Sequence, residues 1–170
     1  EVSSWLNIPV WMKNPTSWDL DIMVNSIAAW QTPSTYAIGT EIYETEGNNL
    51  SHWVLRWWTD WPNYTKKDIE ETYEMMKTRK IKSPAIIIDT NHANSQKKYE
   101  RQIEIMAEVM VSTSKDEELK NLIKWFMVES YIYDGRQNYS ENCKKWLSLT
   151  DPCIWKEKTE DLIMKLYNML

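Results

Sequence analysis

The chain has 170 residues and a formal net charge of -5 at pH 7, and its 42% hydrophobic and 26% charged residues are typical of a globular domain, which excludes a disordered or fibrous chain. It has no basic cluster for a nucleic acid or an anionic membrane surface, and no apolar run of the roughly 18 residues that a membrane span needs. We therefore expect a cytoplasmic domain without nucleic-acid or membrane partners. Its two cysteines, Cys143 and Cys153, suit a reducing compartment better than a disulfide framework.

Short apolar runs alternate along the chain with longer segments of helical periodicity. Most of the runs are apolar at successive positions, as in strands buried on both faces of a parallel sheet, and they predict strands at residues 8–12, 35–38, 53–55, 85–88 and 122–128. Helices are predicted at residues 19–29, 66–80, 95–111 and 159–170. Residues 40–50 are expected to form a turn or short hairpin, and residues 134–151 an irregular stretch. This order predicts an α/β fold with right-handed crossovers.

Charged side chains follow four of the five predicted strands. Lys13 follows the first strand, Arg56 the third, Asp89 and His92 the fourth, and Glu129 the fifth. The carboxyl ends of parallel strands form the functional face of α/β proteins, so these residues are expected to converge on one site.

Two kinds of chemistry are open to this set. Lys13 and Arg56 can together hold a phosphate or carboxylate, although charges that simply reach solvent at strand ends are an equally good interpretation. His92, Glu129 and Asp151 form a mixed nitrogen and oxygen set that suits a divalent ion such as manganese, iron or zinc. A single histidine such as His92 is more often a hydrogen-bonded structural residue.

The blocks around these residues have a recognisable pattern. Residues 86–95, with Gln102 a little later, resemble the strand-to-helix segment of the class I 3-deoxy-D-arabino-heptulosonate 7-phosphate synthases. The resemblance continues through residues 126–130, 134–137 and 148–154, and upstream through residues 9–14, 54–56 and 62–64.

This resemblance implies the carboxyl-terminal half of a (β/α)8 barrel, from about strand 5 to strand 8, over residues 1–170. The implied enzyme is a transferase that condenses phosphoenolpyruvate with erythrose 4-phosphate and releases phosphate, at the entry to aromatic amino-acid biosynthesis. By similarity, His92, Glu129 and Asp151 would bind a divalent metal (manganese, iron, zinc or cobalt), and Lys13, Arg56 and His92 would be catalytic. The same three residues and Asp151 would bind substrate.

The resemblance also implies properties of the whole enzyme. An aromatic amino acid would act as effector near residues 6–46, and the full-length protein would be a homo-oligomer. The family's remaining metal ligand, a cysteine on the first barrel strand, and its Lys-Pro-Arg-Thr segment are not in this chain, which begins with Glu1. We expect a half barrel with two unpaired sheet edges to fold poorly or aggregate, and to be inactive alone.

The tryptophan content is unusual. The chain has 3 glycines and 11 tryptophans, whereas average usage predicts roughly 12 glycines. Eight tryptophans stand where the family pattern has glycine: Trp5, Trp11, Trp18, Trp57, Trp58, Trp125, Trp146 and Trp155. We hypothesise that the gene is read with UGA as glycine and was translated here with UGA as tryptophan. Trp30, Trp53 and Trp61 fit this hypothesis less well.

Two other functions are consistent with parts of the sequence. A related 3-deoxy-octulosonate 8-phosphate synthase would use a different sugar phosphate. A carbohydrate-binding module would use the tryptophans as stacking platforms, which requires them in register on one sheet face.

Overall fold

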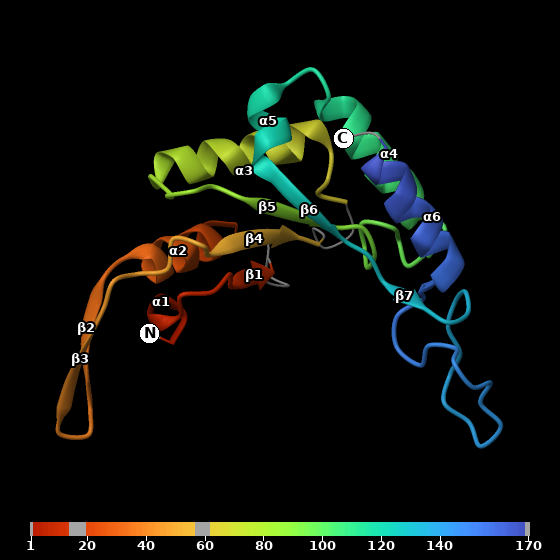
Figure 1. The fold of residues 1–170 in the computed structure, drawn as a ribbon, viewed down its shortest axis with the longest axis horizontal. Helices are drawn as coiled ribbons and strands as arrows, with labels where there is room; N and C mark the ends of the chain where they lie inside the picture. Colours follow the sequence, from red (N-terminus) through yellow and green to blue (C-terminus); the bar gives the residue numbers. More distant parts are fainter. Residues whose placement is uncertain (1, 14–19, 57–61, 169–170) are drawn as a thin grey trace.

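The centre of the molecule is a four-stranded parallel sheet. The structure, a computed structural model, describes residues 2–13, 20–56 and 62–168. The strands lie in the order β1 (Trp11–Lys13), β4 (His52–Leu55), β5 (Ile86–Asp89) and β6 (Ile123–Met127). Successive strands of this sheet are connected along the chain by helices (Figure 1). These are α2 (Leu20–Gln31), α3 (Lys66–Thr78), α4 (Arg101–Thr113) and α5 (Glu117–Leu122). Strands adjacent along this path are also adjacent in space, as in a segment of a (β/α)8 barrel, and the predicted α/β fold is confirmed.

One face of this sheet packs against the helices. Alternate residues of the two inner strands point to this face, and Trp53, Leu55, Ile86 and Ile88 are fully buried in it. The helices contribute the rest of this core, principally Met23, Val24, Ile27, Ile69, Met76, Ile105, Val109, Leu119 and Leu122. Helix α3 is also fixed at its start by a capping box that Thr65 and Asp68 form.

The other face of the sheet carries a row of four residues, one from each strand. Lys13 pairs with Val54, Val54 with Ile87, and Ile87 with Trp125. In a closed barrel this face would line the interior. The Trp125 side chain is 72% exposed here, because β6 is an outer strand of the sheet in the described part of the chain.

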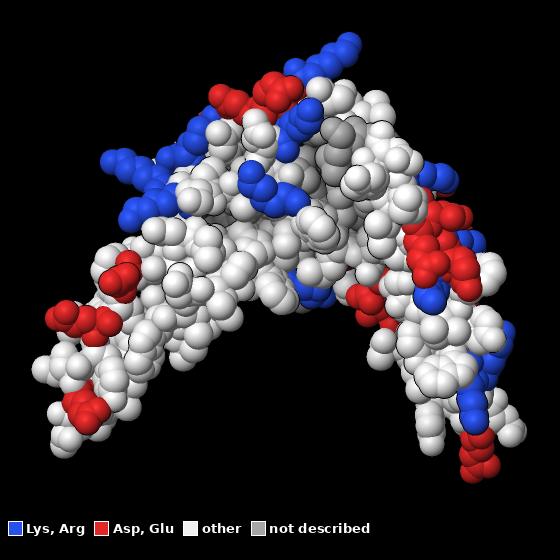
Figure 2. All heavy atoms as spheres, in the orientation of Figure 1, with Lys and Arg blue, Asp and Glu red and all other residues white. Residues whose placement is uncertain are grey.

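A hairpin projects from the sheet. It consists of β2 (Ser34–Ile38) and β3 (Glu41–Thr45), paired antiparallel, so only its second strand lies within residues 40–50, where a turn or short hairpin was predicted. The prediction that residues 35–38 form a strand of the buried parallel sheet was wrong. These residues pair within the hairpin, where Ile38 is 51% exposed. The hairpin extends to the lower left of Figure 1, and the charged side chains visible on it in Figure 2 are acidic.

The hairpin lies between α2 and β4 in the chain and packs against the short helix α1 (Val2–Trp5). The Ser4 and Thr45 hydroxyls are 3.1 Å apart, and the Trp5 ring lies 5.1 Å from the Tyr43 ring and 6.1 Å from the Tyr36 ring. Helix α1 was not predicted from the sequence.

Several element boundaries differ from the predictions, and β1 begins at Trp11 instead of residue 8. Helix α4 begins at Arg101 instead of residue 95, because Gln96 and Lys97 adopt positive φ angles of 54° and 58° that a helix does not allow. Helix α5 was not predicted, and α6 spans Lys156–Tyr167. The irregular stretch 134–151 lies between two short strands, β7 (Ser130–Tyr131) and β8 (Ile154–Trp155), that pair in parallel. None of the described helices is long and apolar enough to cross a membrane.

Candidate metal centre

The polar residues predicted to converge do lie along the carboxyl edge of the sheet. Lys13 is the last residue of β1, and Asp89 is the last residue of β5. Arg56 comes one residue beyond the Leu55–Ile88 pair, level with Asp89, and Glu129 comes two residues after β6. The loops that follow the strands complete the site with His92 and Asp151.

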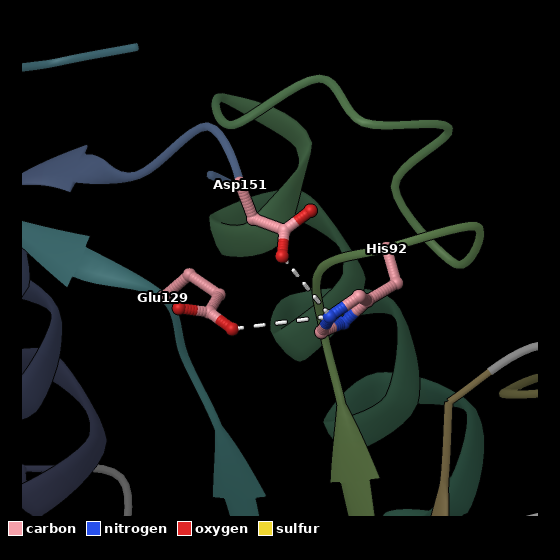
Figure 3. A group of neighbouring side chains, drawn as sticks. All are labelled: His92, Glu129 and Asp151. Carbon is pink, nitrogen blue, oxygen red and sulfur yellow. Dashed lines mark ion pairs between the residues drawn. The ribbon is translucent and has the colours of Figure 1, made fainter. Parts of the chain in front are cut away.

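Three of these side chains meet at one point. The His92 Nε2 atom lies 3.9 Å from Glu129 Oε1 and 3.6 Å from Asp151 Oδ2 (Figure 3). One ligand atom from each of the three residues lies within 4.8 Å of the other two. The three residues come from three separate loops, after β5, after β6 and before β8, so only the fold brings them together.

The geometry and chemistry of this group fit a divalent ion. Two atoms bound to the same ion at roughly 2.1 Å each can lie up to about 4.2 Å apart, and both distances from His92 are below that limit. One imidazole nitrogen and two carboxylates supply the mixed donor set that manganese, iron and zinc accept. The His92 side chain is 16% exposed and the two carboxylates are 36% exposed, so a ligand can still reach them.

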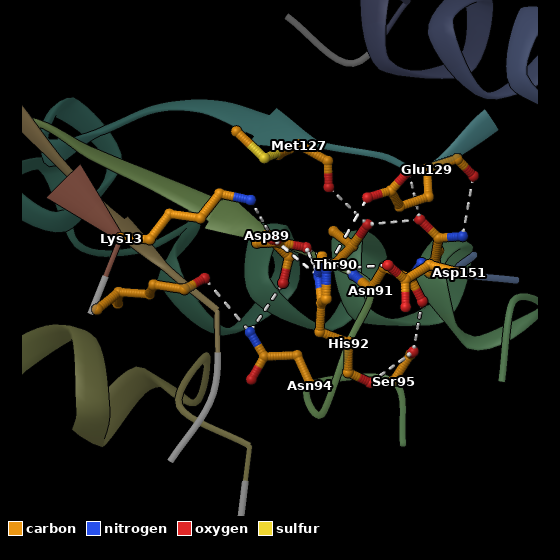
Figure 4. Close-up of polar contacts among 12 residues, drawn as sticks. Lys13, Asp89, Thr90, Asn91, His92, Asn94, Ser95, Met127, Glu129 and Asp151 are labelled. Atoms are coloured by element: carbon orange, nitrogen blue, oxygen red, sulfur yellow. Dashed lines mark hydrogen bonds and ion pairs between the residues drawn. The ribbon is translucent and has the colours of Figure 1, made fainter. Parts of the chain in front are cut away.

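Two buried amides hold the loops that carry the carboxylates. Gln102 is fully buried and acts as a clamp on Glu129: its Oε1 accepts from the Glu129 amide at 2.8 Å, and its Nε2 donates to the Glu129 carbonyl at 3.1 Å. Asn91 is fully buried as well, and its Nδ2 donates to the carbonyl of Pro152, next to Asp151, at 3.1 Å. Figure 4 shows Asn91 between the β5 loop and the Asp151 loop. These contacts fix the backbone of Glu129 and of Pro152, the residue after Asp151.

Asp89 is a buried anion between His92 and Lys13. Burial raises the pKa of its carboxyl, whereas the hydrogen bond and charge of His92 and the charge of Lys13 lower it, and the net shift of the pKa is downward. The Lys13 Nζ atom lies 3.3 Å from Asp89 Oδ2. The Asp89 carboxylate therefore holds the Lys13 ammonium group close to His92, at the carboxyl edge of the sheet.

Sequence reasoning placed Asp89 at this edge but gave it no role, and it assigned none to Asn91 or Gln102. The sequence signal for all three was weak. Asp89 and Asn91 stand next to an apolar strand and Gln102 stands inside a predicted helix, and neither place shows which distant groups a polar side chain will bind. The structure supplies those partners.

The comparisons with known proteins agree with this geometry. Residues 1–164 match the family model described as the DAHP synthetase I family. The chain belongs to this family. It is 32% identical over 176 residues to the Phe-sensitive phospho-2-dehydro-3-deoxyheptonate aldolase of Escherichia coli K12, covering 99% of this chain and 49% of that protein. It is 29% identical over 181 residues to the phospho-2-dehydro-3-deoxyheptonate aldolase of Corynebacterium glutamicum, covering 98% of this chain and 47% of that protein.

A solved member of the DAHP synthetase I family has the same fold. The phospho-2-dehydro-3-deoxyheptonate aldolase of Francisella tularensis SCHU S4 superimposes with a TM-score of 0.82 at 27% identity, over 98% of this chain and 49% of that chain. The chain thus spans about half the length of the curated relatives that it matches, and its parallel sheet is part of a barrel. The family likeness does not favour a carbohydrate-binding module.

The exposed tryptophans among the described residues do not form a stacking platform either. Five of the eight positions where the family pattern has glycine are described, and all five side chains are at least 39% exposed, on separate elements or loops: Trp5, Trp11, Trp125, Trp146 and Trp155. Trp53, by contrast, is fully buried in the core. Trp146 has a φ of 65°, a conformation that favours glycine. Trp18, Trp57, Trp58 and Trp61 lie outside the described residues.

Proposed function

We propose that the protein is a metal-dependent 3-deoxy-7-phosphoheptulonate synthase and that this chain supplies the carboxyl-terminal half of its active site. The observation that carries the proposal is the convergence of His92, Glu129 and Asp151 at the carboxyl edge of a family barrel segment. Two relatives are phospho-2-dehydro-3-deoxyheptonate aldolases, which supports the heptulosonate reaction over that of an octulosonate synthase.

The residues divide into two groups by chemistry. His92, Glu129 and Asp151 would hold a divalent ion, whether manganese, iron, zinc or cobalt. When bound, such an ion polarises the aldehyde of erythrose 4-phosphate and stabilises the alkoxide that develops on its oxygen. Lys13 and Arg56 would bind the anionic groups of phosphoenolpyruvate, and His92 and Asp151 would border the substrates.

The positions of Lys13 and Arg56 suit this task. They lie at the ends of adjacent strands, and Lys13 is 3.3 Å from Asp89, which in turn contacts His92. A cation at that place neutralises the substrate's phosphate and carboxylate. It also fixes the enolpyruvate carbon near the aldehyde, so the reactants meet in one geometry.

The activity test uses protein expressed from its complete gene, with glycine and tryptophan variants of the tryptophan-rich positions made in parallel. We expect phosphate release from phosphoenolpyruvate with erythrose 4-phosphate and far less with arabinose 5-phosphate. A chelator should abolish the activity, and Mn²⁺ should restore it. Glu129→Gln should lower kcat at least 100-fold, whereas Glu160→Gln, which changes an exposed carboxylate paired with Lys156 on α6, should not. Chelator-resistant activity contradicts the proposal.

We also propose that α1 and the hairpin bind an aromatic amino-acid effector in a full-length homo-oligomer. The Escherichia coli relatives are named Phe-sensitive and Tyr-sensitive. The support in this chain is the pair of Tyr36 and Tyr43, which lie directly opposite each other across the hairpin and give an aromatic side chain a stacking surface. Inhibition by phenylalanine or tyrosine that is lost in Tyr43→Ala is the expected result.

A further inference from the structure

Asp89 contacts both halves of the proposed site from a fully buried position. Its side chain has no exposed surface, and it ends the strand Ile86-Ile87-Ile88. The His92 Nδ1 atom lies 3.0 Å from its Oδ2 and 3.1 Å from its Oδ1, and Lys13 Nζ lies 3.3 Å from Oδ2. Figure 4 shows the Asp89 carboxylate between Lys13 and His92.

The contact with His92 determines which ring nitrogen faces the metal centre. A carboxylate without a proton only accepts hydrogen bonds, so a neutral imidazole beside it carries its proton on Nδ1. The lone pair is then on Nε2, the atom that lies 3.9 Å from Glu129 and 3.6 Å from Asp151. A metal ion needs that lone pair, and a carboxylate behind the ring also makes it more basic.

The backbone around Asp89 holds this arrangement in place. The amide of Asn91 donates to Asp89 Oδ1 at 3.1 Å, and Asn94 Nδ2 donates to the Asp89 carbonyl at 2.8 Å. His92 itself has a φ of 56°, a conformation that is unfavourable for a residue with a side chain. The turn therefore brings the ring back over Asp89, three residues earlier in the chain, at a conformational cost.

We propose that Asp89 is a positioning residue that presents His92 Nε2 to the metal ion and, through its second contact, holds Lys13 at the phosphate side of the same site. This proposal rests on the proposed function. It predicts that one buried carboxylate couples metal affinity to the binding of phosphoenolpyruvate, because both His92 and Lys13 depend on it.

A merely structural carboxylate would behave differently. The buried Asp89 carboxylate is paired with Lys13 and His92, so its removal would leave their charges without a partner. Removing it would therefore lower stability whether its role is structural or positioning. Only a positioning role also predicts a defined tautomer of His92 and a loss of metal affinity larger than that of an equally destabilised protein.

The first experiment needs no variant. In the complete protein labelled with ¹⁵N-histidine and stripped of metal, the His92 signals are assigned by their loss in His92→Gln. We expect the neutral ring of His92 to carry its proton on Nδ1 and its lone pair on Nε2. A neutral ring with its proton on Nε2 overturns the proposal whatever any variant does.

The second experiment measures Mn²⁺ binding by calorimetry without substrates. Asp89→Asn should raise the Kd for Mn²⁺ by 10- to 100-fold, the range typical of lost partners behind metal-bound histidines, and should also raise KM for phosphoenolpyruvate. The control is Asp116→Ala, which removes the α5 cap, where Asp116 accepts from the Leu119 amide, and leaves the site unchanged. Its Kd for Mn²⁺ should stay within threefold.

The outcomes separate this inference from the proposed function. If the unmodified protein binds Mn²⁺ and condenses the substrates while Asp89→Asn keeps its Kd within threefold, only the inference fails. If the unmodified protein binds no divalent ion, both fail. If Asp89→Asn does not fold, the tautomer measurement on the unmodified protein decides.

Discussion

The Gln102 clamp allows a quantitative test of how the metal centre is held. Replacing Gln102 by Leu keeps a side chain of similar size but removes its hydrogen bonds to both backbone groups of Glu129 and its contact with the Thr90 hydroxyl at 3.3 Å. The Glu129 carbonyl keeps a bond from the Ile154 amide at 3.0 Å, and the Thr90 hydroxyl keeps its bond to Met127. The principal loss is therefore the partner of the Glu129 amide.

The expected cost follows from these contacts. An unpaired amide costs about 1–3 kcal/mol, and the lost bond to the carbonyl adds about 1 kcal/mol, so Gln102→Leu should lower the free energy of unfolding by about 2–4 kcal/mol. Because Glu129 also loses its fixed backbone, the affinity for Mn²⁺ should fall as well. Urea unfolding of the complete protein and calorimetry with Mn²⁺ measure the two effects.

Gln137 provides a matched control. It makes the same kind of clamp in the irregular loop, accepting from the Lys144 amide at 2.8 Å and donating to the Lys144 and Leu147 carbonyls at 2.6 and 3.1 Å. Gln137 is only partly buried, so water can replace these bonds, and Gln137→Leu should cost less and leave Mn²⁺ binding unchanged. Equal losses of stability and affinity in the two variants would refute the reasoning.

Three further predictions address other parts of the molecule. Burial and the neighbouring Glu108 raise the pKa of Tyr64 above its ordinary value of 10.0, so its stabilising effect is complete below pH 10 and is lost as pH rises through the higher folded-state pKa. Unfolding free energies measured from pH 9 to 12 should fall more steeply for the unmodified protein than for Tyr64→Phe, and parallel curves would count against this. Residues 1–170 expressed alone should aggregate or unfold without cooperativity, because β1 and β6 are the outer strands of the sheet in the described part of the chain. A product that is monomeric by light scattering and unfolds cooperatively in urea would contradict this expectation. The coding DNA should have UGA at the exposed Trp125 and Trp146 and UGG at the buried Trp53, and sequencing that finds UGG at Trp146 would end the recoding hypothesis.

Much of the fold could be predicted from the sequence because its signals are local. Apolar runs marked three of the four sheet strands to within a residue or two, and helical periodicity marked α3 almost to its ends. The start of α4 was placed six residues early, since nothing in the sequence of residues 95–100 shows that Gln96 and Lys97 adopt left-handed conformations. Strand partners were not predictable for residues 35–38, because a β-branched run does not specify which sheet it joins.

The candidate site, too, could be predicted only in part from the sequence. The ligand types and their places after strands could be predicted, since His92 and Glu129 follow recognisable apolar runs. The residues that hold them could not, because Asn91 and Gln102 act on backbone groups far along the chain, 61 and 27 residues away respectively. Such contacts exist only once the strands are side by side.

The row formed by Lys13, Val54, Ile87 and Trp125 has a consequence for a closed barrel. The lumen of an eight-stranded cylinder is just wide enough for the side chains that fill it, so an indole at position 125 would occupy volume otherwise shared by several strands. Its bulk lies across the sheet from Lys13, the cation proposed to bind phosphoenolpyruvate. A smaller side chain at position 125 would therefore leave more room for the side chains that the remaining strands direct into the barrel.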